Sequence, residues 1–182
     1  MSKVTRLAAE VPVLETARLV LRAHTPADLT DCAAMWADPK VVRFIGLEPS
    51  SRQQTWARML TYAGLWTTLG FGYWAVEEKA SGRLVGEVGF ADFRRELQPS
   101  IEGIPEAGWV FVTAVHGQGY ATEAVAAAIA WGDQKFPRTV CIISPDHLAS
   151  IRVAQKLGYR GMGRALYKSE PTLLMARDRA PA

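Results

Sequence analysis

The feature that most constrains this chain is a glycine turn placed directly before an alanine-rich segment. Residues 115–131 read VHGQGYATEAVAAAIAW. Glycine weakens a helix, so Gly117 and Gly119 suit the start of this strong helix former only where the backbone turns tightly or must stay bare. The preceding residues 106–112, EAGWVFV, are strand-like. The sequence therefore predicts a strand, a glycine turn and a helix in succession.

This succession is typical of an anion site. The first amide N–H groups of a helix lack intrahelical partners, and the helix dipole adds partial positive charge there. We therefore expect residues 117–122 to hold a phosphate or pyrophosphate. No Lys-Ser/Thr pair follows the turn, and Thr122 stands where a dinucleotide fingerprint has Gly or Ala. A lone Gly-x-Gly would favour a merely tight connection over an anion site, so the choice between the two depends on the surrounding residues.

Length and composition indicate one globular domain. The 182 residues suit a single domain over residues 1–182, with residues 1–12 and 178–182 expected to be loose. The net charge of +3 fits a small anionic ligand better than a nucleic acid. The sequence has no apolar run of membrane length and no signal-peptide pattern, so we expect no membrane partner.

The two cysteines indicate neither a disulfide framework nor a metal site. Cys32 and Cys141 lie far apart, in a helical and a strand-like segment, and neither has metal-ligand spacing. We expect both thiols to be buried and reduced, which suits a cytoplasmic protein, and we expect no bound metal.

Capping signals mark the helices. Thr25 with Asp28 forms one capping box, and Ser51 with Gln54 forms another. They predict one helix that ends before residue 39, a proline, and a second that ends near residue 70. Gly158 is expected to close a later helix over residues 147–158.

The expected strands complete a mixed sheet with helices on its faces, an α/β (α+β) fold. They cover residues 18–23, 71–78, 83–93, 106–112, 139–143, 165–168 and 172–176. A long polar loop over residues 94–105 separates the third strand from the fourth, and long ordered loops are often functional.

Three stretches resemble the GNAT superfamily of N-acetyltransferases. WVFVTAVHGQGYATEAVAAAIAW is similar to its acetyl-CoA loop, and HLASIRVAQKLGYR is similar to its second signature. The opening ETARLVLRAHTPADL resembles the Rim-type branch, which includes acetylases of ribosomal-protein N-termini. Together they cover most of the chain in the family's order. The resemblance implies a GNAT-like, mostly antiparallel mixed sheet with helices on both faces.

The sequence departs from the family pattern at three positions. Ala114 stands where the loop usually begins with Gln or Arg, and His147 stands where the second signature has Asn. Ala154 replaces the Tyr that serves as an acid in many relatives. The Rim-type branch commonly lacks this Tyr and carries a Ser at the position of Ser150.

The resemblance implies direct transfer of an acetyl group from acetyl-CoA, the co-substrate, to a primary amine while both are bound. Backbone groups of Val110 and Val112 would contact the pantetheine arm, and an N–H of Phe111 or Val112 would face the thioester oxygen. His147 and Ser150 would lie at the thiol end of the pantetheine. The residues implied for the pyrophosphate are Gly117, Gln118, Gly119, Tyr120, Ala121 and Thr122.

Two acids are candidates for the catalytic base. Glu106 begins the cofactor strand and is the first choice; otherwise it is a solvated strand end. Glu87 lies in an otherwise apolar strand, where burial favours a protonated acid, and is the second choice; otherwise it pairs with an arginine. A water relay to either acid stays open. Ser150, one turn before Ala154, is the candidate that assists the leaving thiolate. Glu123 is expected to be structural.

The acceptor stays open between a small-molecule amine and a protein N-terminal amine. Trp56, Trp66 and the loop over residues 94–105 are expected to govern its choice. A homodimer is compatible with the family, and no nucleic-acid partner is expected. A rival reading is a catalytically weak acyl-CoA-binding or sensing module, which the departures at Ala114, His147 and Ala154 would suit. A third is a phosphate-binding structural domain without thioester chemistry.

Overall fold

Eight strands form a single sheet in the computed structural model, which describes residues 10–46 and 48–179. The strand order is β1-β2-β3-β4-β5-β6-β8-β7, and every neighbouring pair is antiparallel except β5 with β6. The predicted mixed, mostly antiparallel sheet is therefore confirmed. The strands are β1 (Leu14–Glu15), β2 (Leu19–Arg22), β3 (Tyr73–Glu78), β4 (Leu84–Ala91), β5 (Glu106–Phe111), β6 (Arg138–Ile143), β7 (Arg160–Tyr167) and β8 (Glu170–Asp178).

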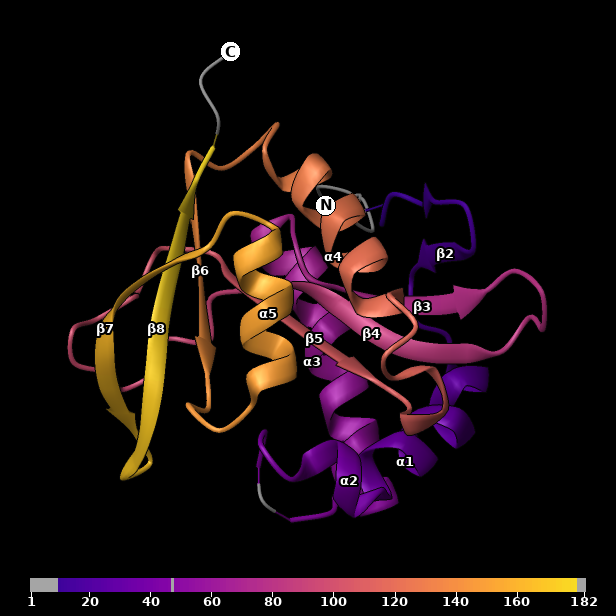
Figure 1. The fold of residues 1–182 in the computed structure, drawn as a ribbon. Helices are drawn as coiled ribbons and strands as arrows, with labels where there is room; N and C mark the ends of the chain where they lie inside the picture. The colour runs from indigo at the N-terminus through magenta and orange to yellow at the C-terminus, as the bar shows by residue number, and fades with distance from the viewer. Residues whose placement is uncertain (1–9, 47, 180–182) are drawn as a thin grey trace, which may run out of the picture.

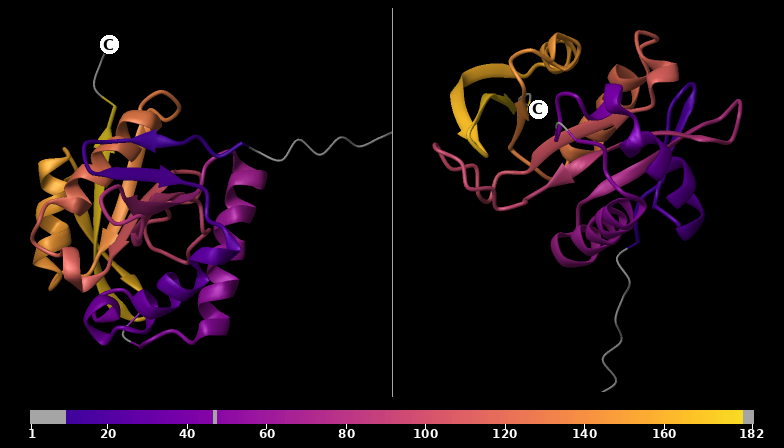
Figure 2. Two further views of the ribbon diagram at one scale, coloured as in Figure 1. Left: turned by 90° about the vertical axis from the view of Figure 1, so that its right-hand side faces the viewer. Right: turned by 90° about the horizontal axis from the view of Figure 1, so that it is seen from below.

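Helices cover both faces of the sheet. Figures 1 and 2 show α3 behind the central strands and α4 and α5 in front of them. The front helices pack on one apolar core with β4 and β5, and α1 and α3 pack on a second core behind the same strands. The helices are α1 (Leu29–Ala37), α2 (Pro39–Val42), α3 (Arg52–Leu69), α4 (Tyr120–Gly132) and α5 (Leu148–Lys156), with short 3₁₀ turns η1 (Pro26–Asp28) and η2 (Thr113–Val115). Among the described residues, none of the helices has both the length and the apolar character needed to cross a bilayer.

The helix caps form as the sequence predicts. Ser51 and Gln54 exchange hydrogen bonds, with Gln54 Oε1 accepting from the Ser51 N–H at 2.7 Å and Ser51 Oγ accepting from the Gln54 N–H at 3.2 Å. Gly158 has a φ of +89° after α5. The Tyr159 N–H donates to the carbonyl of Ala154, and the Gly158 N–H donates to that of Gln155. This pattern is a Schellman motif, which requires a residue in the left-handed region and therefore favours glycine.

The structure differs from the predicted elements at a few places. Pro39 does follow the end of α1, but it opens the short helix α2, because the Asp38 side chain accepts from the Lys40 N–H and caps a new first turn. The last two strands are longer than predicted, and β1 was not predicted. Asp178, expected in a loose terminus, belongs to β8 and pairs with Arg138. Residues 1–9 and 180–182 lie outside the described part of the chain.

The key feature of the sheet is an opening between β5 and β6. Within residues 10–46 and 48–179 these two strands pair at one position, Glu106 opposite Val140. On its other side β5 is fully paired with β4, and the Val112 N–H continues this pairing by donating to the Val85 carbonyl at 2.9 Å. Because successive backbone groups point to opposite sides of a strand, the N–H groups of Trp109 and Phe111 face the opening.

Gly89 of β4 and Gly108 of β5 let the side chain of Tyr73 lie across the back of the β4–β5 pair. Tyr73 of β3 is in register with Gly89 of β4, which is in register with Gly108 of β5. A Cβ at Gly108 would overlap the Tyr73 hydroxyl, and the next nearest atom would be Tyr73 Cζ at 3.0 Å. The Tyr62 ring stacks on Tyr73 with the centroids 4.4 Å apart. Gly108 is therefore required for close packing rather than for an unusual φ.

We expect Gly108→Ala to lower the free energy of unfolding by about 1–3 kcal/mol, the usual cost of overpacking. Adding Tyr73→Phe removes the overlapping oxygen and should recover part of this loss. Gly161→Ala is the matched control, since nothing lies within 4 Å of that position in β7. Denaturant unfolding of the four proteins measures the effect; equal stability of Gly108→Ala and Gly161→Ala would contradict it.

Candidate active site

The glycine turn follows β5 and the short 3₁₀ turn η2, and it has the backbone geometry that requires glycine. Gly117 has a φ of +76° and Gly119 a φ of +83°, and Gly119 is the N-cap of α4. Residues 116–119 are exposed, so the N-terminus of α4 opens to solvent. The turn therefore presents bare backbone and the partial positive charge of a 13-residue helix on one surface. Both properties suit an anion.

Glu123 and Arg18 fix this turn to the N-terminal strands. Glu123 Oε1 accepts from Thr16 Oγ1 at 2.6 Å and from the Arg18 N–H at 2.9 Å, and Glu123 Oε2 accepts from Arg18 Nε at 2.7 Å. Burial alone would raise the pKa of Glu123, but these hydrogen bonds outweigh it and lower the pKa. Arg18 also donates to the Gln118 carbonyl at 3.0 Å and lies 4.1 Å over the Tyr120 ring. Glu123 thus has the structural role expected of it.

Arg18 is a residue of the site that sequence reasoning missed. Its Nη2 would lie 3.5 Å from a Cβ at Gly119, so a guanidinium stands directly beside the anion turn. The local sequence supplies no Lys or Arg between residues 113 and 122. No local pattern pointed to Arg18, because this residue lies directly before β2, about a hundred residues earlier, and only the fold brings it to the turn.

The first turn of α5 faces β5 across the opening. Ser150 is buried, and its Oγ accepts a hydrogen bond from Trp109 Nε1 at 3.2 Å. His147 Nε2 lies 3.4 Å from the same Oγ, and the Phe44 ring stacks on His147 with the centroids 4.7 Å apart. The structure therefore brings Ser150 and His147 together beside β5. Ala154 is fully buried one turn later and offers no polar group.

The backbone pairing corrects part of the expected cofactor contacts. The Val112 N–H is taken by Val85, and the alternation along β5 directs the backbone of Val110 toward β4 as well. Neither N–H is free to meet a pantetheine or a thioester. Of the two N–H groups considered for the thioester oxygen, that of Phe111 points into the opening. The Phe111 carbonyl, however, lies 2.9 Å from His116 Nε2.

Glu106 is buried in an ion pair instead of lying at a solvated strand end. Its side chain is 5% exposed, and its two oxygens accept from Arg95 Nε at 2.7 Å and Arg95 Nη2 at 3.0 Å. Arg95 also donates to the Tyr167 hydroxyl at 2.6 Å. The acid sits where β5 still pairs with β6. Phe111 lies five residues further along β5, roughly 17 Å away at strand spacing.

Glu87 is fully buried, and its partners are not arginines. Glu87 Oε2 accepts from Trp36 Nε1 at 2.8 Å. Glu87 Oε1 accepts from Cys32 Sγ at 3.4 Å and lies 3.1 Å from His24 Nε2. Glu87 is in register with Val110, so it lies beside the part of β5 next to Phe111. The two candidate acids therefore share their burial but differ in their partners and in their place along β5.

The residues expected to govern acceptor choice have mixed placements. Trp66 is 4% exposed and packs edge-on against Trp74 and Trp131 in the core, so it does not line a substrate pocket. Trp56 remains partly exposed on α3. The loop over residues 94–105 contributes Arg95, which is committed to Glu106.

Comparison with known proteins identifies the class. Residues 18–160 match the family model of the acetyltransferase (GNAT) domain. The chain therefore belongs to the GNAT family and is an acetyltransferase. YoaA, an uncharacterized N-acetyltransferase of Bacillus subtilis (strain 168), is 29% identical over 158 residues, which cover 84% of this chain and 85% of YoaA.

Solved structures share the same fold. A protein of Bordetella pertussis assigned to the GnaT family of acetyltransferases superposes with a TM-score of 0.81 at 31% identity, covering 92% of this chain and 99% of its own. The Rim-type protein RimL, a ribosomal L7/L12 alpha-N-protein acetyltransferase in complex with coenzyme A, has a TM-score of 0.74 at 15% identity, covering 92% and 98%. The resemblance read from the three sequence stretches is confirmed, with Rim-type proteins among the structural neighbours.

His147 gives the site a pH-dependent contribution to stability. Burial lowers the pKa of His147 below its ordinary value, and the nearby His116 lowers it further. The unfolded chain therefore binds this proton more readily than the folded protein does. The stability that neutral His147 provides is present above the ordinary histidine pKa and is lost as the pH falls through the lowered pKa of the folded state.

We therefore expect the free energy of unfolding to fall more steeply between pH 7 and pH 5 in the wild type than in His147→Gln. Urea unfolding at a series of pH values measures both slopes, with His116→Gln as a control for the exposed histidine. Parallel curves for the wild type and His147→Gln would show that the burial of His147 has no such effect.

Proposed function

We propose that this acetyltransferase moves the acetyl group of acetyl-CoA directly to a primary amine while both reactants are bound in the sheet opening. The observation that carries the proposal is the half-paired strand β5, whose open edge ends at the glycine turn. A thioester arm along the open edge and a pyrophosphate on the turn would use both features. Coenzyme A would supply the activated acetyl thioester.

The chain supplies positioning and polar groups. The exposed N-terminus of α4, with Gly117 and Gly119, would hold the pyrophosphate, and Arg18 would add a positive charge beside it. The Phe111 N–H would donate to the thioester oxygen as negative charge develops there. Holding two reactants in one place can itself lower a barrier by roughly 7–11 kcal/mol. These are the main demands of acyl transfer to an amine.

The geometry favours Glu87 over Glu106 as the base. A bidentate arginine occupies both oxygens of Glu106, so neither is free to accept a proton from an amine. Glu87 is held by the neutral donors of Trp36 and Cys32 and lies beside Val110, next to the proposed position of the thioester. Because Glu87 is fully buried, a water relay would carry the proton from the amine to it. Transfer forms the nitrogen–carbon bond and breaks the carbon–sulfur bond.

Ser150 is proposed to assist the departing thiolate. Its Oγ accepts a hydrogen bond from Trp109, which leaves its own O–H to donate, either to His147 Nε2 at 3.4 Å or to a thiolate bound beside it. His147 beside it would position the serine. The acceptor is proposed to be a small-molecule amine or a protein N-terminal amine, and the enzyme is proposed to act in the cytoplasm, where the buried thiols Cys32 and Cys141 would stay reduced.

A second candidate function is a catalytically weak acyl-CoA-binding or sensing module. It is favoured by one observation, that the oxygens of both buried acids are occupied by hydrogen bonds within the protein. Release of free coenzyme A thiol with a panel of primary amines separates the two candidates. Sustained thiol release that depends on an amine supports the enzyme, and tight binding without release supports the module.

Gly119→Ala should weaken coenzyme A binding by about tenfold to a hundredfold, the range expected when hydrogen bonds to a charged group are lost. Gly82→Ala is the matched control. Gly82 has a φ of +67° in the β3–β4 turn and nothing lies within 4 Å of it, so it carries the same backbone strain away from the site. Calorimetric titration of the folded variants measures the affinities. Equal affinities would remove the pyrophosphate from this turn.

Glu87→Gln should slow single-turnover acetyl transfer by about a hundredfold or more, as loss of a general base does, with little change in acetyl-CoA affinity. Glu106→Gln is the matched control, since it changes an equally buried acid in the adjacent strand, and it should keep most of the wild-type rate. The opposite result would restore Glu106 as the base. Full activity in both variants would point to an amine that arrives already neutral.

Ser150→Ala should lower the single-turnover rate by about tenfold to a hundredfold at saturating acetyl-CoA, the lower part of a general acid's usual contribution or just below it. The dissociation constant of acetyl-CoA should change much less. Thr139→Ser is a suitable control, because Thr139 is a buried hydroxyl residue of β6 bonded to Tyr159. A wild-type rate in Ser150→Ala would mean that the thiolate leaves without this serine.

A further inference from the structure

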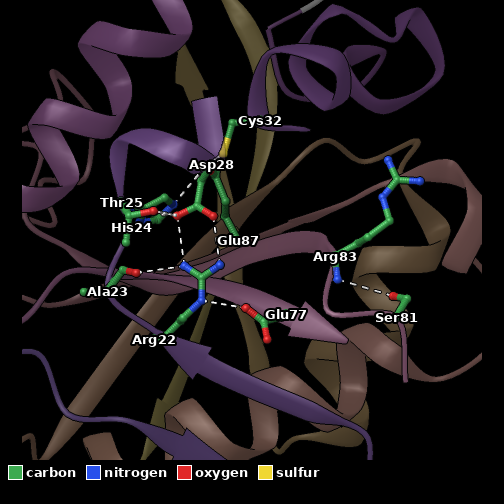
Figure 3. A network of polar contacts seen from close by, with 10 residues as sticks. All are labelled: Arg22, Ala23, His24, Thr25, Asp28, Cys32, Glu77, Ser81, Arg83 and Glu87. Atoms are coloured by element: carbon green, nitrogen blue, oxygen red, sulfur yellow. Dashed lines mark hydrogen bonds and ion pairs between the residues drawn. The ribbon is translucent and has the colours of Figure 1, made fainter. Parts of the chain in front are cut away.

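Three potential metal ligands meet behind the sheet, and no feature of the sequence indicates that they would. His24 follows β2, Cys32 lies in α1 and Glu87 lies in β4. One ligand atom from each lies within 4.8 Å of the other two. Figure 3 shows the three side chains converging beside Asp28. Their spacing along the chain matches no metal-binding pattern. The three side chains meet only because α1 and the loop after β2 pack on β4.

The distances suit a small divalent ion. Glu87 Oε1 lies 3.1 Å from His24 Nε2 and 3.4 Å from Cys32 Sγ. Zinc bonds of about 2.0–2.3 Å in tetrahedral geometry place neighbouring ligand atoms roughly 3.3–3.6 Å apart. Both distances to the carboxylate are near this spacing, and the ligand atoms of His24 and Cys32 lie within 4.8 Å of each other, so modest side-chain movements would let the three share an ion. Imidazole, thiolate and carboxylate are also the ligand types that zinc takes in proteins.

Charge balance favours an ion in this buried place. Glu87 and Cys32 are fully buried, and the His24 side chain is 5% exposed. A doubly charged cation with a neutral imidazole, a thiolate and a carboxylate has no net charge, so the assembly avoids the cost of an unpaired buried charge. Burial and the neighbouring Glu87 raise the pKa of Cys32, but a bound metal ion removes the proton of a coordinating thiol outright.

The surroundings of the cluster support three protein ligands. Trp36 Nε1 donates to the other oxygen of Glu87 at 2.8 Å, which orients the carboxylate as outer partners do at metal sites. The nearby Asp28 is not counted as a ligand, because both its oxygens accept hydrogen bonds from Arg22 at 2.8 and 2.9 Å. Zinc also binds to three protein ligands when a water molecule completes the tetrahedron.

We propose that His24, Cys32 and Glu87 form a binding site for zinc or a similar thiophilic divalent cation. An ion there ties the loop after β2 and the helix α1 to β4. It also occupies the oxygen of Glu87 that faces His24 and Cys32, so it inhibits acetyl transfer. The inhibition rests on the proposed role of Glu87 as base, whereas the binding does not.

Cobalt absorption tests the binding without reference to activity. Metal-stripped protein titrated with Co²⁺ should develop a thiolate-to-cobalt charge-transfer band, and Zn²⁺ should displace it. Cys32→Ser should abolish the band, while Cys141→Ser, at the other buried thiol, should leave it unchanged. His24→Asn and Glu87→Gln should each weaken cobalt binding by at least about tenfold, as loss of one ligand does.

Three results would overturn the site: no band in the wild type, a band that survives Cys32→Ser, or a band that depends on Cys32 alone. Thermal unfolding keeps the test decisive if a variant is unstable, because Zn²⁺ should raise the Tm of the wild type and of Cys141→Ser but not that of Cys32→Ser.

Activity separates the two claims. Zn²⁺ should slow acetyl transfer in the wild type and much less in Cys32→Ser, each relative to its own metal-free rate. Zinc that binds with the cobalt-defined ligands but leaves the rate unchanged would uphold the site and overturn both the inhibition and the assignment of Glu87 as base.

Discussion

The unequal pairing of β5 is the constraint on which the rest of the site depends. One edge of the strand is bonded to β4 along its whole length, and the other edge is paired with β6 at Glu106. Buried backbone groups need partners, so the open N–H groups of Trp109 and Phe111 call for water or a ligand. The glycine turn follows the end of this open edge. The unpaired backbone of β5 and the N-terminus of α4 therefore face the same opening.

The same strand also separates two chemically different sides. In front, Ser150 and His147 of α5 meet Trp109 across the opening. Behind, Glu87 and Tyr73 lie between the sheet and the helices α1 and α3. A thioester in the opening would therefore have a hydroxyl donor on one side and a buried carboxylate on the other. This division fits a reaction in which the leaving thiolate needs a donor and the attacking amine needs an acceptor for its proton.

Local signals predicted the elements better than they predicted the contacts between them. The capping box of Ser51 and the Schellman glycine Gly158 act within one helical turn, so the sequence alone was sufficient to find them. The glycine turn was found for the same reason. The direction of the Val112 N–H was not predictable, because it depends on the register of β5 against β4. Arg18 and the partners of both acids come from distant elements and gave no local signal.

The kind of partner, more than burial, distinguishes the two acids. Glu106 and Glu87 are both shielded from water, but Glu106 is paired with the permanently charged Arg95, which occupies both of its oxygens. Trp36 and Cys32, which donate to Glu87, are neutral, and the third contact of Glu87 is His24 Nε2 at 3.1 Å. The cluster of His24, Cys32 and Glu87 also favours a cation. Among the described residues no arginine or lysine contacts Glu87, so no fixed positive charge there would repel a cation.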